Sequence, residues 1–527
     1  MKVGRAIWLS GATMASRVLG LLRDQVFAIL IGANRWSDAF VVAFRIPNLL
    51  RDLFAEGALS SAFVPTFADA RRNRGPDAAW RLAGTVVSLV LVLVGAIVLA
   101  GIAWADQVVA LIAPGLEAEF SGVTAGLTQV MMPFLLLVSL SAVAMGMLNA
   151  QGRFTAPALA PALFNVGSIA VGLGLWWAGW PPERAVQGWA LGTLLGGLLQ
   201  LLAQLPSLRA SGWRPMLGLT RERLADPGLR RIGRLMAASV IGLSATQVNI
   251  LVNTIFASHQ AGAVTWLQMA FRLMQLPLGV FGVAIATVAG AGVAQAAAAR
   301  DLPAAKATLG SALKLVAFFN VPSAVGLAVV GGPIVSLIYQ HGRFGAAAAE
   351  ATAQALACYA LGLYAYSAVK VMAPAFYALD RARVPVVGSI LGMVVNVGLN
   401  VALYPVLGFR GVALGTSLAA GANLAVLLVA WRREYGGLGG AGLVAQLGRV
   451  LVASAVLAVV AWGTAAALGA ALPPGGLWRQ AVLGLVPVVA GAAAYFGVAR
   501  ALGVEELGEV MAALRRKGGE SPASGAP

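Results

Sequence analysis

Apolar runs long enough to cross a bilayer recur along nearly the whole chain, and this feature restricts the fold more than any other. A transmembrane helix needs about 20 predominantly apolar residues. Of the 527 residues, 59% are hydrophobic and only 11% are charged, whereas soluble domains carry about 25% charged residues. No polar stretch is large enough to form a separate soluble domain. We therefore expect an all-α integral membrane protein without an appended soluble enzyme.

Breaks at glycine, proline and charged residues divide these runs into about 14 predicted transmembrane helices. The first half of the chain contains the predicted spans 5–31, 36–66, 80–104, 124–149, 157–180, 185–208 and 232–257. The second half contains 264–298, 307–330, 348–378, 384–406, 411–431, 446–471 and 478–501. The basic start of the first span mimics a signal peptide. However, Arg17, Arg23 and Asp24 lie inside a segment that stays apolar to Ile31, which predicts a retained helix.

The distribution of Lys and Arg predicts the sidedness of these spans. An even number of spans places both termini on one side, and cytoplasmic loops carry the excess of Lys and Arg. With cytoplasmic termini, 26 of the 37 basic residues fall in cytoplasmic segments. Only five fall in the opposite loops, namely Arg35, Arg184, Arg343, Arg410 and Arg479. The net charge of +17 is therefore mostly a topology signal, and the scattered basic residues do not indicate nucleic-acid binding.

Two sequence echoes predict that the chain is built from two similar halves. AFRIPNLLRDLFAEGAL matches AFRLMQLPLGVFGVAIA and aligns Arg45 with Arg272, an offset of 227 residues. An Arg-x-x-x-Pro spacing begins at Arg153 and again at Arg381, 228 residues later. Six helices separate the echoes, so an axis along the membrane normal relates the halves, as in transporters built from parallel repeats. Chance similarity between apolar helices is the alternative explanation.

The repeat predicts two six-helix lobes followed by two additional helices. The expected divisions are an N-lobe at 1–208, a cytoplasmic linker at 209–231, a C-lobe at 232–432, two C-terminal helices at 433–502 and a cytoplasmic tail at 503–527. Such lobes flank a central cavity and rock about it.

The first predicted hairpin concentrates charged residues inside the membrane. Residues 16–25 and 36–67 contain Arg17, Arg23, Asp24, Asp38, Arg45, Arg51, Asp52 and Glu56. A charged side chain at the bilayer centre costs roughly 2.5 to 3.5 kcal/mol even on lenient insertion scales. These side chains must therefore face water, partners or a ligand.

Two interpretations of these arginines remain open. Guanidinium groups bind phosphate oxygens bidentately, so a cavity with several arginines suits an anionic lipid-linked precursor. Alternatively, the hairpin arginines pair with neighbouring acids and only hold the lobe together. Arg272 has no acidic residue near it in the sequence, which favours contact with a ligand.

The sequence contains no pattern for catalysis or metal binding. It has no H-E-x-x-H motif, no Cys/His cluster and no paired carboxylates outside the charged hairpin. His259 and His341 lie far apart at predicted helix ends, and the single cysteine, Cys358, permits no intrachain disulfide. An intramembrane glycosyl or acyl transferase would need such groups. We therefore expect a transporter without a cofactor.

Six motifs distributed along the chain point to a known family. They are SRVLGLLRD, SDAF, NLLRDLFAEGALSSAFVPTF, LNAQGRFTAPALAPALFN, AFRLMQLPLGVFGVAIAT and APAFYALDRARVPV. At these residues the chain closely resembles the MurJ/MviN family, the lipid II flippases of the multidrug/oligosaccharidyl-lipid/polysaccharide exporter superfamily. The resemblance covers essentially the whole chain, and the motifs are highly specific when taken together.

The resemblance implies a lipid II flippase that works by alternating access. Such a protein moves undecaprenyl-diphosphate-linked disaccharide-pentapeptide from the cytoplasmic to the periplasmic leaflet for peptidoglycan synthesis, and so supports cell-wall biogenesis and cell shape. The matching positions are, for substrate binding, Arg17, Arg23, Arg51 and Arg272, and, for gating or ion pairing, Ser16, Asp24, Asp38 and Glu56. The two helices in 433–502 are expected to form a groove for the polyprenyl tail.

The chain departs from the family pattern at several charged positions. Phe271 stands where the family commonly has an acid, and Asp52 stands where a second basic residue is frequent. Some members have a sodium site with acids in the seventh and eleventh helices. The polar residues of this chain in that region are Asn253, Asn396, Asn400 and Thr416. Because amides ligate Na⁺ without contributing charge, we expect a weak ion site at most, and coupling to the membrane potential or to protons.

The same resemblance leaves an alternative cargo and predicts the location of the protein. Another lipid-linked oligosaccharide, such as an O-antigen precursor, suits the same architecture, whereas a drug cation would need an acidic cavity. We expect a multi-pass monomer in the bacterial inner membrane with both termini in the cytoplasm. Its expected partners are lipid II and membrane lipids, with cell-wall synthesis proteins as candidate associates.

Overall fold

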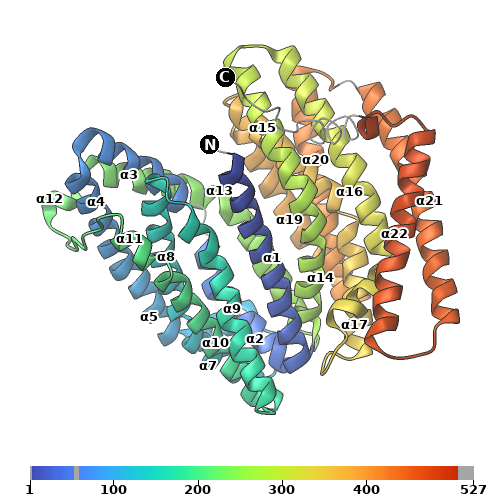
Figure 1. Ribbon diagram of the computed structural model, residues 1–527, viewed down its shortest axis with the longest axis horizontal. Coiled ribbons are helices and arrows are strands. Elements are labelled where there is room, and N and C mark those ends of the chain that lie inside the picture. Colours follow the sequence, from blue (N-terminus) through green and yellow to red (C-terminus); the bar gives the residue numbers. More distant parts are fainter. Residues whose placement is uncertain (1–2, 53–58, 439, 509–527) are drawn as a thin grey trace, which may run out of the picture. The chain divides into compact units, whose positions relative to one another are not determined.

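The computed structural model describes residues 3–52, 59–438 and 440–508, and its regular elements in these ranges are helices (Figure 1). Lipid offers no hydrogen-bond partners to backbone N–H and C=O groups, so spanning segments form helices or closed barrels. Within the described ranges the regular elements of the chain are helices, which confirms the predicted all-α membrane fold. Glu56 and the predicted tail beyond residue 508 lie outside the described residues.

The helices follow the apolar runs of the sequence closely. The elements before residue 260 are α1 (Val3–Ile31), α2 (Arg35–Leu50), α3 (Ser60–Arg74), α4 (Pro76–Leu89), the π-helical segment η2 (Val90–Val94), α5 (Gly95–Ala103), α6 (Ala105–Ile112), α7 (Ala118–Met131), α8 (Pro133–Ala150), α9 (Thr155–Trp177), α10 (Pro182–Leu202), α11 (Leu205–Arg209), α12 (Arg221–Leu224) and α13 (Pro227–Ala257). The later elements are α14 (Ala263–Pro277), the π-helical segment η3 (Leu278–Gly282), α15 (Val283–Ala298), α16 (Leu302–Tyr339), α17 (Ala346–Ala360), α18 (Leu363–Ala378), α19 (Arg383–Leu407), α20 (Phe409–Tyr435), α21 (Gly440–Ala471) and α22 (Leu477–Ala501).

Each predicted span coincides with one helix or with a short run of helices. The predicted span 384–406, for example, corresponds to α19. Among the described residues, ten helices are long and apolar enough to cross a bilayer, or eleven when the bent pair α17–α18 counts as one span. The predicted spans 5–31, 36–66 and 232–257 lie outside that set, so the count of fourteen stays a prediction.

The helices group into two compact units. The first comprises Met1–Thr265 with Tyr339–Ala348, and the second comprises Trp266–Ile338 with Ala349–Pro527. The first unit includes α13. Most of this helix falls in the predicted C-lobe, which is expected to begin at residue 232, directly after the linker at 209–231. The packing of α13 against α3, α4 and α6 accounts for the difference.

Small residues and aromatic rings pack the first unit. Phe67 of α3 and Trp80 of α4 are both buried, with ring centroids 5.4 Å apart. Helix α9 lies along α1, and Gly172 permits this approach because a Cβ atom there would lie 2.9 Å from Val26. The close fit between α1 and α9 places the charged part of α1 beside the first half of α9.

The segment between α10 and α13 packs onto the first unit. Gly84 of α4 leaves the space that the backbone of Met216 occupies, because a Cβ atom at position 84 would overlap the Met216 carbonyl. The Gly218 N–H donates to the Ser88 hydroxyl at 2.9 Å. The predicted linker at 209–231 is therefore held against α4 by backbone contacts.

The connection between α16 and α17 supplies hydrogen-bond donors to the C-terminal end of α1. This segment, Tyr339–Ala348, belongs to the first unit. The Arg343 side chain donates to the Leu30 carbonyl at 2.7 Å and to the Trp180 carbonyl at 3.1 Å, and its backbone N–H donates to the Ile29 carbonyl at 3.1 Å. Since the last carbonyls of a helix have no intrahelical donor, Arg343 supplies hydrogen bonds that the end of α1 needs.

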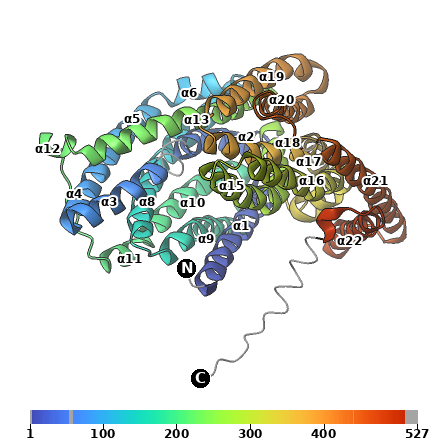
Figure 2. The ribbon, with the colours of Figure 1, turned by 90° about the horizontal axis from the view of Figure 1, so that it is seen from above.

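The second unit has two packed cores. One core lies among α15, α16, α18 and α20, and includes the buried Phe376 and Trp431. The other lies among α16, α21 and α22, and includes Phe318 and Tyr495. Figures 1 and 2 show α21 and α22 side by side. After α22 the chain turns back, and Glu506 accepts a hydrogen bond from Gln446 of α21.

Candidate substrate site

Arg23 and Asp24 of α1 form an ion pair that is largely removed from solvent. The Arg23 Nη2 and Nε atoms donate to Asp24 Oδ1 at 2.8 and 3.2 Å. Their side chains are only 15% and 10% exposed. An arginine in such surroundings keeps its charge and its five N–H donors. The pair therefore holds a cation and its counter-charge inside the helical region.

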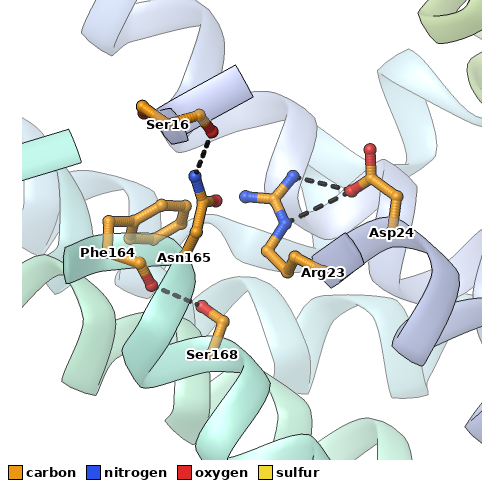
Figure 3. A network of polar contacts seen from close by, with 6 residues as sticks. All are labelled: Ser16, Arg23, Asp24, Phe164, Asn165 and Ser168. Carbon is orange, nitrogen blue, oxygen red and sulfur yellow. Dashed lines mark hydrogen bonds and ion pairs between the residues drawn. The ribbon is translucent and has the colours of Figure 1, made fainter. Parts of the chain in front are cut away.

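Helix α9 supplies two further residues to this site. The Arg23 guanidinium carbon lies 5.3 Å from the centroid of the Phe164 ring. The neighbouring Asn165 side chain donates to the Ser16 carbonyl at 3.1 Å. Figure 3 shows the guanidinium between the Asp24 carboxylate on one side and Phe164 and Asn165 on the other. Ser16, Arg23 and Asp24, which the sequence predicts as functional, thus belong to one network.

Phe164 and Asn165 are absent from the predicted site residues. Both end the motif LNAQGRFTAPALAPALFN, which carries the family resemblance. An amide inside an otherwise apolar helix is costly unless it has a partner, and this is the signal in the sequence that singles out Asn165. Its partner lies 149 residues away, so the sequence alone does not identify it.

Arg51 repeats the pairing at the end of α2. Its Nη2 and Nε atoms donate to Asp52 Oδ1 at 3.0 and 3.2 Å. Both side chains are partly exposed, at 23% and 32%. Pairing with a neighbouring acid, as the second interpretation of the hairpin predicts, is therefore present at Arg23 and at Arg51. Because both pairs use Nε and Nη2 along one edge of the guanidinium, ion pairing is compatible with recognition of a phosphate.

Arg17 and Arg272 stand apart from these pairs. Arg17 lies on an exposed part of α1. Arg272 lies on α14 in the second unit and is partly buried. Beside it, Phe271 packs edge-on against Tyr359 at 5.4 Å, in place of the acid that is common in the family. Convergence of the four arginines on one cavity stays a prediction.

Asp38 makes contacts that the sequence did not predict, because its partners are uncharged groups far away in the chain. Its Oδ2 atom accepts from the Gly262 N–H at 2.6 Å. Its Oδ1 atom accepts from the N–H and the hydroxyl of Thr265 at 2.9 and 2.8 Å. The side chain is fully buried. Free N–H groups and the helix dipole favour a carboxylate at a helix N-terminus, so Asp38 anchors the start of α14, the helix that continues to Arg272.

Three of the polar residues considered for sodium are joined by hydrogen bonds. Asn400 Nδ2 donates to Asn396 Oδ1 at 3.1 Å, and Asn396 Nδ2 donates to the Thr416 hydroxyl at 3.2 Å. Asn253 lies on α13 in the first unit. In the part of the chain that the structure describes, no three His, Cys, Asp or Glu side chains are grouped to hold a metal ion. Within this neutral set the Asn396 Oδ1 and Thr416 Oγ1 atoms already accept hydrogen bonds.

An apolar cavity of about 340 Å³ lies in the second unit. It is bounded by α14 with η3, by α16, and by both C-terminal helices α21 and α22. Phe281 and Phe319 stack in its wall with centroids 4.5 Å apart, and Leu457 and Gly491 contribute from the C-terminal pair. Its lining suits a branched hydrocarbon chain. The helices predicted to form a tail groove, α21 and α22, thus supply part of an apolar cavity.

The sequence of this chain is similar to that of known proteins over most of its length. The family described as "Lipid II flippase MurJ" matches residues 27–475. A lipid II flippase MurJ of Burkholderia cenocepacia is 34% identical over 432 residues, which cover 81% of this chain and 83% of that protein. A probable lipid II flippase MurJ of Rhizobium meliloti is 34% identical over 517 residues, which cover 96% of this chain and 95% of that protein.

Solved structures show that the fold is also shared. A lipid II flippase MurJ in an inward closed conformation gives a TM-score of 0.76 at 23% identity, covering 94% of this chain and 98% of that chain. An inward-facing transporter of the multidrug resistance MATE family gives a TM-score of 0.67 at 18% identity, covering 80% of this chain and 95% of that one. The helical fold of this chain is therefore shared with these two proteins.

Proposed function

Because the chain belongs to the MurJ family of lipid II flippases, we propose that it moves lipid II from the cytoplasmic to the periplasmic leaflet of the bacterial inner membrane. The family match over residues 27–475 is the observation that carries this proposal. A transporter of this kind needs a charged site for the headgroup and an apolar site for the tail. A buried ion-paired arginine and an apolar cavity support the proposal.

The charged site supports recognition of a diphosphate or of peptide carboxylates. Arg23 is held inside the helical region by Asp24, and Arg51 is held by Asp52. Hydrogen bonds between guanidinium groups and phosphate are roughly twice as strong as neutral ones and fix the orientation of the anion. We assign headgroup binding to Arg17, Arg23, Arg51 and Arg272, and gating or orientation to Ser16, Asp24, Asp38 and Glu56.

The apolar cavity supports a place for part of the polyprenyl tail. Its walls come from η3, α16, α21 and α22, and they carry stacked aromatic rings and small residues. Burying an apolar chain there gains roughly 0.8 kcal/mol for each CH₂ group that leaves water. A tail that otherwise stays in lipid gains less, so the cavity serves to select and orient the tail.

Alternating access explains how a bound headgroup crosses the membrane. The anionic headgroup enters a site open to the cytoplasm and compensates the charge of the arginines. A ligand shifts a conformational equilibrium only by its difference in affinity for the two states. Headgroup binding therefore has to stabilise the state that leads to release on the periplasmic side.

The membrane potential is the driving force that fits this site best. Moving one elementary charge through 100 mV changes its free energy by about 2.3 kcal/mol. A negatively charged headgroup that leaves a negative cytoplasm gains this energy for each charge. The neutral Asn396, Asn400 and Thr416 network gives no reason to invoke sodium.

We assign the protein no enzymatic activity and no cofactor, and we place both termini in the cytoplasm. The charge distribution of the loops supports this orientation. We expect a monomer that contacts membrane lipids and associates with cell-wall synthesis proteins. Crosslinking in cells to the enzymes that polymerise lipid II tests that association.

Complementation of a strain depleted of its lipid II flippase tests the function. We expect growth with the wild-type chain and with Arg184→Ala, which removes an exposed arginine outside the site. We expect no growth with Arg23→Ala or Arg272→Ala at equal amounts in the membrane, because each removes a cation that binds the headgroup. Periplasmic exposure of lipid II is measured in the same cells.

The outcomes of this experiment separate function from site. Growth with Arg23→Ala and Arg272→Ala at the wild-type rate would contradict the arginine site while leaving the function intact. Absence of rescue by a well-expressed wild-type chain would contradict lipid II as cargo and would direct attention to another lipid-linked oligosaccharide.

A further inference from the structure

The Phe164 ring lies against the cation of the charged site, at the separation of a cation–π contact. The Arg23 guanidinium carbon is 5.3 Å from the ring centroid. This distance is inside the range in which the negative face of an aromatic ring attracts a cation. Arg23 is only 15% exposed, so little water screens the attraction.

The ring is held rigidly from two other sides. Phe134 of α8 packs against it with centroids 5.4 Å apart at 46°. Gly196 of α10 lies so close that a Cβ atom there would be 2.8 Å from a Phe164 ring carbon and 2.6 Å from its carbonyl oxygen. Phe164 itself is only 7% exposed. Because α8 and α10 hold the Phe164 ring in place, the ring offers a fixed surface to the Arg23 guanidinium on α1.

Contacts from Asp24 and from α9 surround the Arg23 side chain. Asp24 binds one edge of the guanidinium through Nε and Nη2. Phe164 lies against it from α9, and Asn165, the next residue, ties α9 to the α1 backbone at Ser16. In Figure 3 the third guanidinium nitrogen points away from Asp24, to the side of Asn165.

We propose that Phe164 is a positioning residue for headgroup recognition, and that its ring holds the Arg23 guanidinium in the orientation that binds the anionic diphosphate or carboxylates of the cargo. The inference rests on the proposed function and adds a residue to that site. A long arginine side chain loses considerable rotamer freedom when it binds. Fixing the guanidinium beforehand lowers this cost and increases affinity. Leucine fills similar space but lacks the ring electrons that attract a cation.

Binding of lipid II to the purified full-length chain in detergent tests this proposal. We expect Phe164→Leu to raise the Kd for lipid II about tenfold and Phe164→Tyr to restore binding to within about twofold of the wild type. The matched control is Phe67→Leu, which removes a buried ring of the same core that packs against Trp80. It is expected to lower the melting temperature as much as Phe164→Leu does, with the Kd changed less than twofold.

A double-mutant cycle with Arg23→Gln separates positioning from general packing. If the ring acts through Arg23, Phe164→Leu has no further effect on the Kd when residue 23 is uncharged. A tenfold effect that persists in the Arg23→Gln background would overturn the proposal, as would equal Kd values for Phe164→Leu and the wild type. Absence of lipid II binding by the wild-type chain would instead contradict the proposed function, so the two failures are distinguishable.

Discussion

At the scale of single residues, charged side chains that are partly or fully buried have specific bonding partners. Arg23 and Arg51 each have the acid that follows them in the sequence, whereas Asp38 has two backbone N–H groups and a hydroxyl. The sequence predicts the first arrangement because neighbouring charges are visible in it. It does not predict the second, because Gly262 and Thr265 lie more than 220 residues from Asp38 and offer no charge.

Asp38→Asn is expected to destabilise the first unit more than the loss of one hydrogen bond would. The amide nitrogen of asparagine would face N–H donors at Gly262 or Thr265, which leaves a buried donor without an acceptor. Such a loss costs roughly 3 kcal/mol. Thr265→Val, which removes only the hydroxyl donor, is the control and should cost about 1 kcal/mol. Thermal unfolding in detergent measures both, and equal melting temperatures for the two variants would contradict the anchoring role of the carboxylate.

The missed residues Phe164 and Asn165 show the same limit of sequence reasoning. Both stand in a motif that the sequence singles out, but their roles depend on which helix lies beside α9. That neighbour is α1, and the contact joins residues about 140 to 150 positions apart. A pattern within one helix identifies a costly amide, whereas only the fold identifies its partner.

At the scale of elements, the boundaries of the helices could be predicted well and their interruptions less well. The predicted span 478–501 differs from α22 by one residue, because Gly476 and the apolar run mark its limits. The predicted span 36–66 contains most of α2 and the start of α3, and residues 53–58 between them lie outside the described residues. Pro47 inside α2 removes a backbone donor close to the point where α2 ends.

Gly84→Ala is expected to weaken the docking of the segment between α10 and α13. The new methyl group would overlap the Met216 carbonyl, so the backbone of that segment must move away from α4. We expect faster proteolysis between residues 209 and 231 and a lower melting temperature. Gly95→Ala in the same apolar run is the control, because no neighbouring heavy atom lies within 4 Å of the added carbon. Because alanine has a higher helix propensity than glycine, Gly95→Ala should be as stable as the wild type or slightly more stable. Equal cleavage of both variants would show that the contact is dispensable.

At the scale of the whole molecule, composition was sufficient for the class of fold but not for its internal grouping. Apolar runs predicted an all-helical membrane protein, and the structure confirms that class. The grouping of α13 and of the loop Tyr339–Ala348 with the first unit was not predictable. Both depend on packing contacts, such as those of Arg343 with Leu30, that no periodicity encodes.

The energy source gives a prediction for the complete transporter. In proteoliposomes, lipid II transport should proceed at the same rate when Na⁺ outside and inside is replaced by choline, because the network of Asn396, Asn400 and Thr416 is uncharged. A potassium diffusion potential that makes the cytoplasmic side negative should accelerate transport, since it drives the anionic headgroup outward. Protein-free vesicles provide the background rate. A strict requirement for Na⁺ would contradict this assignment.

Helix α14 and its continuation η3 set the distance between two groups that a ligand of this region would contact. Arg272 and Phe281, a residue of the cavity wall, are nine positions apart on this element. At about 1.5 Å per residue they are separated by roughly 13 Å along the axis. A lipid that contacts both must place its negative charge and its first buried methyl branches at that spacing. We therefore expect this spacing to favour long branched chains joined directly to a diphosphate over anions whose hydrocarbon begins farther away.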